Sequence, residues 1–229
     1  SMINHVRNTV LSVLNKENRG FLTPAQFNSY AKHAQQLIFN QYLSEYSRML
    51  LAKNARQTSS EFLDRSEVMQ RKLEAFTKEL SVAISANKYT KPTDLQYLVA
   101  VRYGNLEVEQ VSRDKERFLL NSNLTAPSAN FPVFVDEPLA ITLHPSTLTN
   151  NVNFIYLRNP KDPKWTYNTI GENPVFNQSA SDYQDFEIDG TETVPLVIEI
   201  LKLAGVTIRE GEVTQVAQNI DVANTNKDS

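Results

Sequence analysis

Residues 95–108 read Leu95-Gln96-Tyr97-Leu98-Val99-Ala100-Val101-Arg102-Tyr103-Gly104-Asn105-Leu106-Glu107-Val108. Apolar side chains recur at every second position from Tyr97 to Tyr103, which is the period of a β-strand with one covered face. Gly104-Asn105 supplies a two-residue turn, and Leu106 begins a return strand. The stretch therefore predicts a β-hairpin, and it marks the change from helical to strand periodicity in this chain.

Further strands are predicted downstream, at residues 132–135, 139–143 and 152–157. Short consecutive strands joined by tight turns are typical of an antiparallel sheet. Pro160 and Pro163 then follow within a few residues of each other, and two prolines this close cannot continue a hydrogen-bonded ladder. We therefore expect an irregular loop that leaves the sheet and ends at Trp165, the only tryptophan of the chain.

Upstream of the hairpin the apolar residues follow the helical period. Those between Ile3 and Leu14 predict a short amphipathic helix. Thr23-Pro24-Ala25-Gln26 then combines a cap, a proline at the first helical position and the glutamine of a capping box. The apolar stripe from Phe27 to Leu50 predicts a long helix behind this signature.

A third helix is predicted to start at Thr58, which forms a second capping signature with Glu61, and to continue through Phe62, Met69, Leu73, Phe76 and Leu80 to Ala83. Near the C-terminus, Pro195 and Gly205 bracket an apolar segment and predict a buried helix. A last helix is expected over residues 213–220, followed by a flexible tail.

The sequence thus predicts an α+β fold: an N-terminal helical bundle with long amphipathic helices, an antiparallel β-sheet in the middle, and C-terminal helices. The expected ranges are 1–92 for the helical region, 93–188 for the β-rich region, 189–222 for C-terminal helices that pack on the helical region, and 223–229 for the tail.

Composition excludes several classes of function. The chain has no cysteine, so disulfides, thiolate metal sites and thiol nucleophiles are excluded. Its net charge is −3, from 23 basic and 26 acidic residues, which lacks the basic excess of DNA-reading proteins. The three histidines, His5, His33 and His144, have no metal-ligand or acid–base spacing. We therefore expect a soluble protein that is not an enzyme and has no cofactor and no membrane segment.

Two segments have alternative readings. Residues 15–26 have the rhythm of a calcium loop, but Arg19 stands at a ligand position and Gln26 replaces the bidentate glutamate, so a plain helix-joining turn is favoured. The acidic group from Asp182 to Glu192 could hold a hard cation, although a solvated loop is favoured. Its aromatic residues Tyr183 and Phe186 could instead anchor a neighbouring subunit.

Aromatic, proline and arginine side chains supply the candidate interface. Arg48, near the end of the long helix, either complements the helix dipole or meets an acidic partner, and the first reading is favoured. The full candidate set is Tyr42, Tyr46, Arg48, Pro160, Pro163, Trp165, Tyr183 and Phe186.

Three parts of the text carry a resemblance: Val10 to Asn28 (VLSVLNKENRGFLTPAQFN), Leu139 to Pro145 with Val152 to Trp165 (LAITLHP and VNFIYLRNPKDPKW), and Ile198 to Glu210 (IEILKLAGVTIRE). They resemble small virion proteins of tailed bacteriophages, particularly crAss-like gut phages, that are similar to head-to-tail connector subunits. The resemblance implies a closed ring, twelvefold if it matches the portal, with the portal and neighbouring neck or tail proteins as partners and DNA passing through the channel. The alternatives are another neck or tail protein and a virion-associated enzyme.

Overall fold

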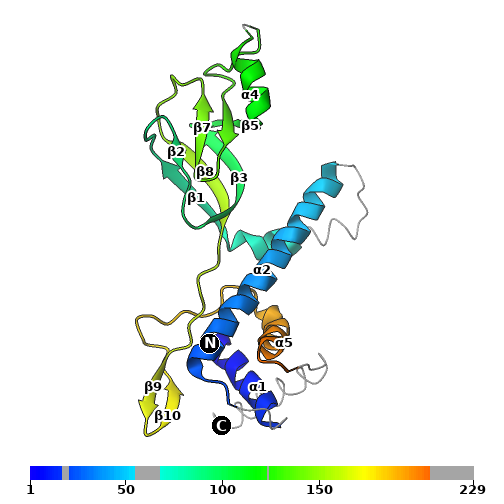
Figure 1. Cartoon of the computed structure of the whole chain (residues 1–229), viewed down its shortest axis with the longest axis vertical. Coiled ribbons are helices and arrows are strands. Elements are labelled where there is room, and N and C mark those ends of the chain that lie inside the picture. The colour runs from blue at the N-terminus through cyan, green and yellow to red at the C-terminus, as the bar shows by residue number, and fades with distance from the viewer. Residues whose placement is uncertain (17–20, 55–67, 123, 207–229) are drawn as a thin grey trace. The chain divides into compact units, whose positions relative to one another are not determined.

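A computed structural model of the chain describes residues 1–16, 21–54, 68–122 and 124–206 (Figure 1). It is a mixed α+β protein whose internal contacts form two compact units. Unit 1 comprises Ser1–Ala75 and Pro160–Ser229, and unit 2 comprises Phe76–Asn159. The chain therefore leaves the helical unit, builds the β unit and returns to the helical unit.

Helices build unit 1. They are α1 (Met2–Lys16), the 31-residue α2 (Pro24–Asn54), a helical stretch over residues 68–74, a short 3₁₀ turn η1 (Gly190–Glu192) and α5 (Thr193–Leu203). α5 packs against both α1 and α2. These contacts bury apolar residues of all three helices, including Ile3, Val10, Phe27, Ile38, Leu196 and Ile200. The C-terminal helix α5 thus completes the core of the N-terminal helices.

Local signals correctly predicted the start of α2 and the end of α5. At the start of α2, the Thr23 amide donates to Gln26 Oε1 at 3.0 Å, and the Gln26 amide donates to Thr23 Oγ1 at 3.2 Å. These reciprocal bonds satisfy two amides that a helix start leaves without partners. At the end of α5, Gly205 adopts φ +82°, a left-handed conformation that glycine reaches without strain.

Two four-stranded sheets build unit 2, in the orders β1-β8-β3-β4 and β2-β7-β6-β5. The predicted hairpin is confirmed as β3 and β4, and Gly104 turns between them with φ +59°. The predicted strands downstream are confirmed as β6, β7 and β8. The elements are β1 (Thr77–Val82), β2 (Tyr89–Thr90), β3 (Leu95–Tyr103), β4 (Leu106–Glu107), β5 (Glu109–Val111), α4 (Arg113–Leu120), β6 (Val133–Asp136), β7 (Ala140–His144) and β8 (Val152–Arg158).

The core of unit 2 lies between the two sheets. β8 contributes Phe154 and Tyr156 from one sheet, and β7 contributes Ile141 and Leu143 from the other. Neighbouring strands in the sheets are antiparallel except for β5 and β6, which run parallel. A parallel pair needs a crossover connection, and the segment that contains α4 provides it. The antiparallel pairing predicted from sequence is confirmed at the other strand pairs of unit 2, and β5–β6 departs from it.

The predicted third helix is wrong beyond residue 74. Residues 77–82, which include Leu80, form β1 and pair with β8, where Leu80 lies opposite Phe154. Ala83 follows β1 and lies outside any helix. The helical spacing of a few apolar residues misled the prediction, because pairing with a distant strand outweighs the local period of a short segment.

A second hairpin, absent from the predictions, belongs to unit 1. It consists of β9 (Tyr167–Ile170) and β10 (Asn173–Phe176), with Gly171 at φ +65° in the turn (Figure 1). Several predictions lie outside the described residues: the capping signature of Thr58 and Glu61, Phe62, Arg19 of the calcium-like loop, and the helix and tail after residue 206.

Candidate interaction surfaces

Trp165 ties the loop after unit 2 to the helices of unit 1. Its backbone amide donates to Asn28 Oδ1 at 2.8 Å, and Asn28 Nδ2 donates back to the Trp165 carbonyl at 3.1 Å. The indole Nε1 donates to Asn4 Oδ1 at 3.0 Å. Only 2% of the Trp165 surface is exposed, because α1 and α2 each hold it by side-chain amides. The tryptophan is thus an internal anchor of unit 1.

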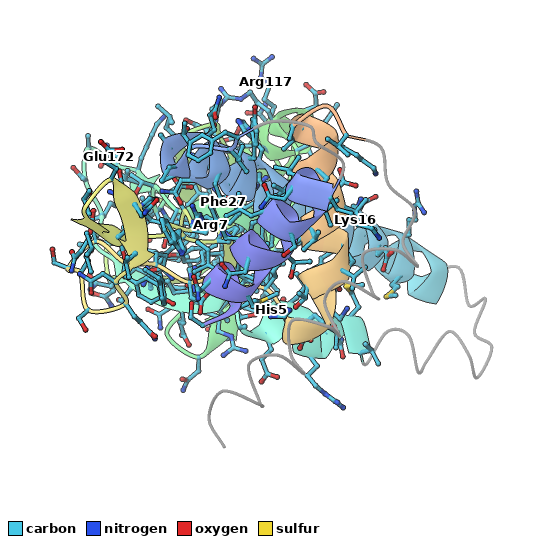
Figure 2. The ribbon with its side chains drawn as sticks, turned by 90° about the horizontal axis from the view of Figure 1, so that it is seen from below. His5, Arg7, Lys16, Phe27, Arg117 and Glu172 are labelled. Carbon is cyan, nitrogen blue, oxygen red and sulfur yellow. The ribbon has the colours of Figure 1, made fainter. Side chains whose placement is uncertain are left out.

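A buried cation covers the indole. Arg7 projects from α1 into the interior of unit 1 (Figure 2), and its guanidinium carbon lies 3.8 Å from the centre of the Trp165 ring. Arg7 is 7% exposed, and its Nε has no hydrogen-bond partner in the described part of the chain. Burial lowers the pKa of Arg7 because desolvation disfavours the charged form. The π face of the indole is the contact that offsets part of this cost.

Gln35 holds the two ends of the loop between β8 and α5. This side chain is 1% exposed on α2; its Nε2 donates to the Lys161 carbonyl at 2.8 Å, and its Oε1 accepts from the Glu187 amide at 2.9 Å. Pro160 and Pro163 lie close to Lys161 in the sequence, and both are buried. A buried amide that uses both its donor and its acceptor in this way fixes the loop on the helix.

The acidic loop is used for structural contacts. Asp185 accepts from the amides of Met2 at 2.9 Å and Ile3 at 2.7 Å, and so caps the start of α1. Asp182 pairs with Lys164 at 2.6 Å, and Asp189 caps η1 through the Thr191 amide. Glu187 and Glu192 accept hydrogen bonds from the Lys161 amide and from Tyr42 and Lys72. Each carboxylate therefore meets a different partner.

The sequence-predicted interface residues fall into two groups. Tyr42, Pro160, Pro163, Trp165 and Phe186 are buried within unit 1. Burial, and after it the Glu192 hydrogen bond and charge, raises the pKa of Tyr42. Tyr46 and Tyr183 are half-buried, and Arg48 is exposed on α2. Contact of these eight residues with a partner stays a prediction, but the chain itself already covers the first five.

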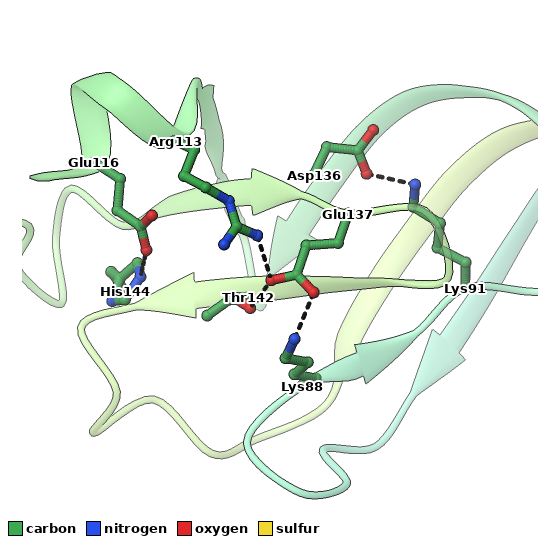
Figure 3. Close-up of polar contacts among 8 residues, drawn as sticks. All are labelled: Lys88, Lys91, Arg113, Glu116, Asp136, Glu137, Thr142 and His144. Atoms are coloured by element: carbon green, nitrogen blue, oxygen red, sulfur yellow. Dashed lines mark hydrogen bonds and ion pairs between the residues drawn. The ribbon is translucent and has the colours of Figure 1, made fainter.

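Unit 2 carries a network of ion pairs on its second sheet (Figure 3). Glu137 accepts from Lys88, Arg113 and Thr142, and the Lys88 bond in particular lowers the pKa of Glu137. Beside it, His144 Nε2 lies 2.7 Å from Glu116 Oε1 and joins β7 to α4. These groups satisfy one another, so the network fastens α4 and the β2 region to the sheet.

A buried tyrosine organises the first sheet. Tyr156 of β8 donates to Asp94 Oδ1 at 2.8 Å, and Lys78 of β1 reaches Asp94 Oδ2 at 2.8 Å. Burial opposes ionisation of Asp94, but the bonds from Lys78 and Tyr156 outweigh it and lower the pKa of the carboxyl. The three residues join β1, β8 and the turn before β3.

Large apolar side chains stand exposed on α4 and the turns after it. Phe118 is 79%, Leu124 96% and Phe131 78% exposed, and Leu120 is about half exposed. We call these four residues the α4 patch. α4 buries no residue, and within unit 2 it lies at one end of the sheets (Figure 1). Large exposed apolar side chains gathered on one short segment in this way are typical of protein contacts.

Among the described residues, no group of three or more His, Asp or Glu side chains is placed to hold a metal ion. Where helices are described, none is both long and apolar enough to cross a bilayer. Comparison of the sequence with protein-family models and with curated proteins finds no match.

Proposed function

We propose that the chain is a structural virion protein of a tailed bacteriophage, a ring-forming head-to-tail connector subunit that joins the portal to the tail. In this proposal the N-terminal helical bundle is the frame of the subunit, and the subunit is a part of the assembled virion without a reaction or cofactor of its own. The resemblance of the three sequence stretches supports the family. The exposed α4 patch is the structural observation that supports an assembly role.

The α4 patch favours a docking function because exposed Phe and Leu side chains cost free energy in water. Each such side chain gains about 1.5–3 kcal/mol when fully covered. Four of them on one helix and its following turns are a driving force for contact with another protein. The mixed charges beside the patch, with Arg113, Lys115 and Arg117 next to Asp114 and Glu116, suit a polar rim.

Electrostatics agree with a role beside DNA. The net charge of −3 lacks the basic excess that would hold the phosphate backbone tightly. A connector that lines the DNA channel has to let DNA pass, so we propose only non-specific proximity to DNA. A ring whose lumen is strongly positive contradicts this part of the proposal.

The test of the proposed function is assembly. The purified chain is mixed with portal protein and neighbouring virion proteins and imaged by electron microscopy, and we expect rings on the portal. A Phe118→Asp/Phe131→Asp variant should lose this association, whereas Leu139→Asp should keep it because Leu139 is as exposed but lies on the turn before β7. If no mixture ever contains a ring with this chain, the connector role is wrong.

A second candidate is another neck or tail structural protein of the same virion. It uses the same exposed surface but has no ring on the portal. Electron microscopy of the mixture separates the two, because this protein joins only once the tail components are added. A virion-associated enzyme is the third candidate, and hydrolysis of DNA or cell wall by the purified protein is the result that supports it.

A further inference from the structure

Unit 2 has an open groove where its two sheets separate. β4 pairs with only the last two residues of β3, through Arg102 and Tyr103, and the Val108 amide then donates to the Val101 carbonyl at 2.8 Å. Beyond this bond the chain turns into β5 and joins the other sheet. The wedge between β3 and β5 has a volume of about 430 Å³; it is lined by residues 98–101 of β3, residues 107–110 and Phe134.

Both sides of this groove are strand edges. In the sheet order β1-β8-β3-β4, β8 covers one side of β3, and β4 covers the other side only at its end. β5 is the last strand of the other sheet. Val99 forms a bulge without a register partner on β8 and is 44% exposed. Backbone groups of alternate residues point to opposite sides of a strand, and Val101 turns its carbonyl towards Val108, so we expect Val99, two residues earlier, to present its backbone groups to the groove.

The β9–β10 hairpin presents a second open edge. The Asn177 amide donates to the Thr166 carbonyl, so Thr166 and Asn177 form a hydrogen-bonded pair at the base of the hairpin. Pairs alternate along an antiparallel ladder, which makes Thr169 and Pro174 a non-hydrogen-bonded pair. The lack of an amide on Pro174 agrees with this pattern. The N–H and C=O of Thr169 therefore point away from β10, to the free edge of β9.

We propose that β9 of one copy pairs with the open edge of β3 in the groove of a second copy. This inference rests on the proposed ring and names the contact between its subunits. The two strand segments match in length, since β9 has four residues and residues 98–101 of β3 line the groove. The floor of the groove is apolar at Leu98, Val101 and Phe134, and β9 carries no charge.

The charges select an antiparallel pairing. Glu107 and Glu109 line the groove on the side where β3 ends, and Glu172 occupies the turn of the hairpin (Figure 2). Antiparallel pairing places Tyr167 near Val101 and carries Glu172 towards the start of β3, away from both glutamates. Parallel pairing instead carries Glu172 towards Glu107 and Glu109, and the single positive charge of Arg102, opposite Glu107, offsets only part of the repulsion among three carboxylates.

The hairpin itself gains from such a contact. An isolated two-stranded hairpin is marginally stable in water, and a third strand adds main-chain hydrogen bonds. Every residue of β9 is exposed within the chain, and β10 covers only one of its edges. The contact is also heterologous, since the hairpin and the groove are different surfaces of the subunit. Repetition of a heterologous contact closes into a ring when its rotation closes.

Because the chain has no cysteine, introduced cysteines are the only thiols that a cross-linker can join. Val99→Cys and Thr169→Cys variants, one of them tagged, are mixed with the other virion proteins and treated with a short bismaleimide. We expect the mixed V99C–T169C product to exceed both same-variant products severalfold. The same samples are imaged for rings. Rings without the mixed product overturn the hairpin contact and leave the connector role standing, whereas absence of both rings and product overturns the two together.

A pair of variants tests the backbone bond. Thr169→Pro removes the outward amide but no hydrogen bond of the hairpin, and Thr169→Val keeps the amide. We expect Thr169→Pro to weaken self-association about tenfold, the effect of one lost main-chain bond, and Thr169→Val to leave it unchanged. Equal association of the two variants contradicts the proposal. A V99C/T169C double variant that cross-links within single chains at high dilution also contradicts it.

Discussion

Units 1 and 2 differ in the internal contacts that stabilise each of them. In unit 1, a long loop is fixed to helices by specific polar contacts from Asn4, Asn28 and Gln35, with a buried Arg7–Trp165 stack among them. In unit 2, the interior is an apolar core between two sheets, and its ion pairs lie at the periphery. Unit 1 therefore combines an apolar core of packed helices with a loop fixed by a few polar residues far apart in sequence, whereas the interior of unit 2 is mainly packed apolar side chains.

The largest expected effect concerns the tryptophan. Trp165→Ala removes the ring under Arg7 and the hydrogen bond to Asn4, and should lower the unfolding free energy of unit 1 by about 3–5 kcal/mol. Hydrogen exchange should show faster exchange in α1 and α2, with little change in β7 and β8. Phe154→Ala is the matched variant for unit 2 and should give the reverse pattern. Equal loss of protection in both units under either substitution contradicts the comparison.

The next effect concerns the cap of α1. Asp185→Ala removes the carboxylate that accepts from the Met2 and Ile3 amides, and should cost about 1–2 kcal/mol. Asp182→Ala is the control, since the Asp182–Lys164 pair is exposed and solvent screens such a pair, so its loss should change stability little. Thermal unfolding of the two variants measures the difference. If the two variants were equally destabilised, the Asp185 cap of α1 would contribute no more than the exposed Asp182–Lys164 pair.

A smaller, pH-dependent effect is expected in unit 2. The folded pKa of Asp94 is lowered, so its contribution to stability is present above the ordinary value of 3.8 and is lost as pH falls through the folded pKa. Asp94→Asn should therefore cost up to about 1 kcal/mol near neutral pH, because the pair with Lys78 is partly exposed. The gap between wild type and variant should close below that pKa. Denaturant unfolding over an acid pH series measures it, and a gap that is constant with pH contradicts the assignment.

The elements that sequence could predict are those encoded by neighbouring residues. Thr23 and Gln26 lie three residues apart and form the predicted capping box, and Gly104 forms the predicted turn. β1 was missed because its partner β8 lies far along the chain. α4 and the β9–β10 hairpin did have local signals: Ser112 precedes an acidic first turn, and Gly171 stands between two short runs with apolar residues.

The candidate surfaces were harder to predict for a physical reason. Trp165 stood out by its type, but sequence does not show that Asn4 and Asn28 bury it. Aromatic residues are enriched both in cores and in interfaces, so residue type alone does not separate the two. The groove beside β3 depends on where β4 ends and β5 crosses to the other sheet. No residue pattern predicts that the chain crosses from one sheet to the other after β4, and only the pairing of the strands shows it.

The smallest expected effect tests how far the polar contacts of unit 1 contribute to its stability. Arg7 pays for the desolvation of its charge and gains a cation–π contact worth up to about 2 kcal/mol. Arg7→Met keeps the apolar stem against Trp165 and removes the buried charge, so it should leave the unfolding free energy unchanged within about 1 kcal/mol or raise it. Arg7→Ala should lower stability, because it also removes the stem and leaves a cavity. Denaturant unfolding of both variants gives the answer: a loss of more than about 2 kcal/mol in Arg7→Met means that the charge itself stabilises unit 1, through the indole or through an acidic group of a partner.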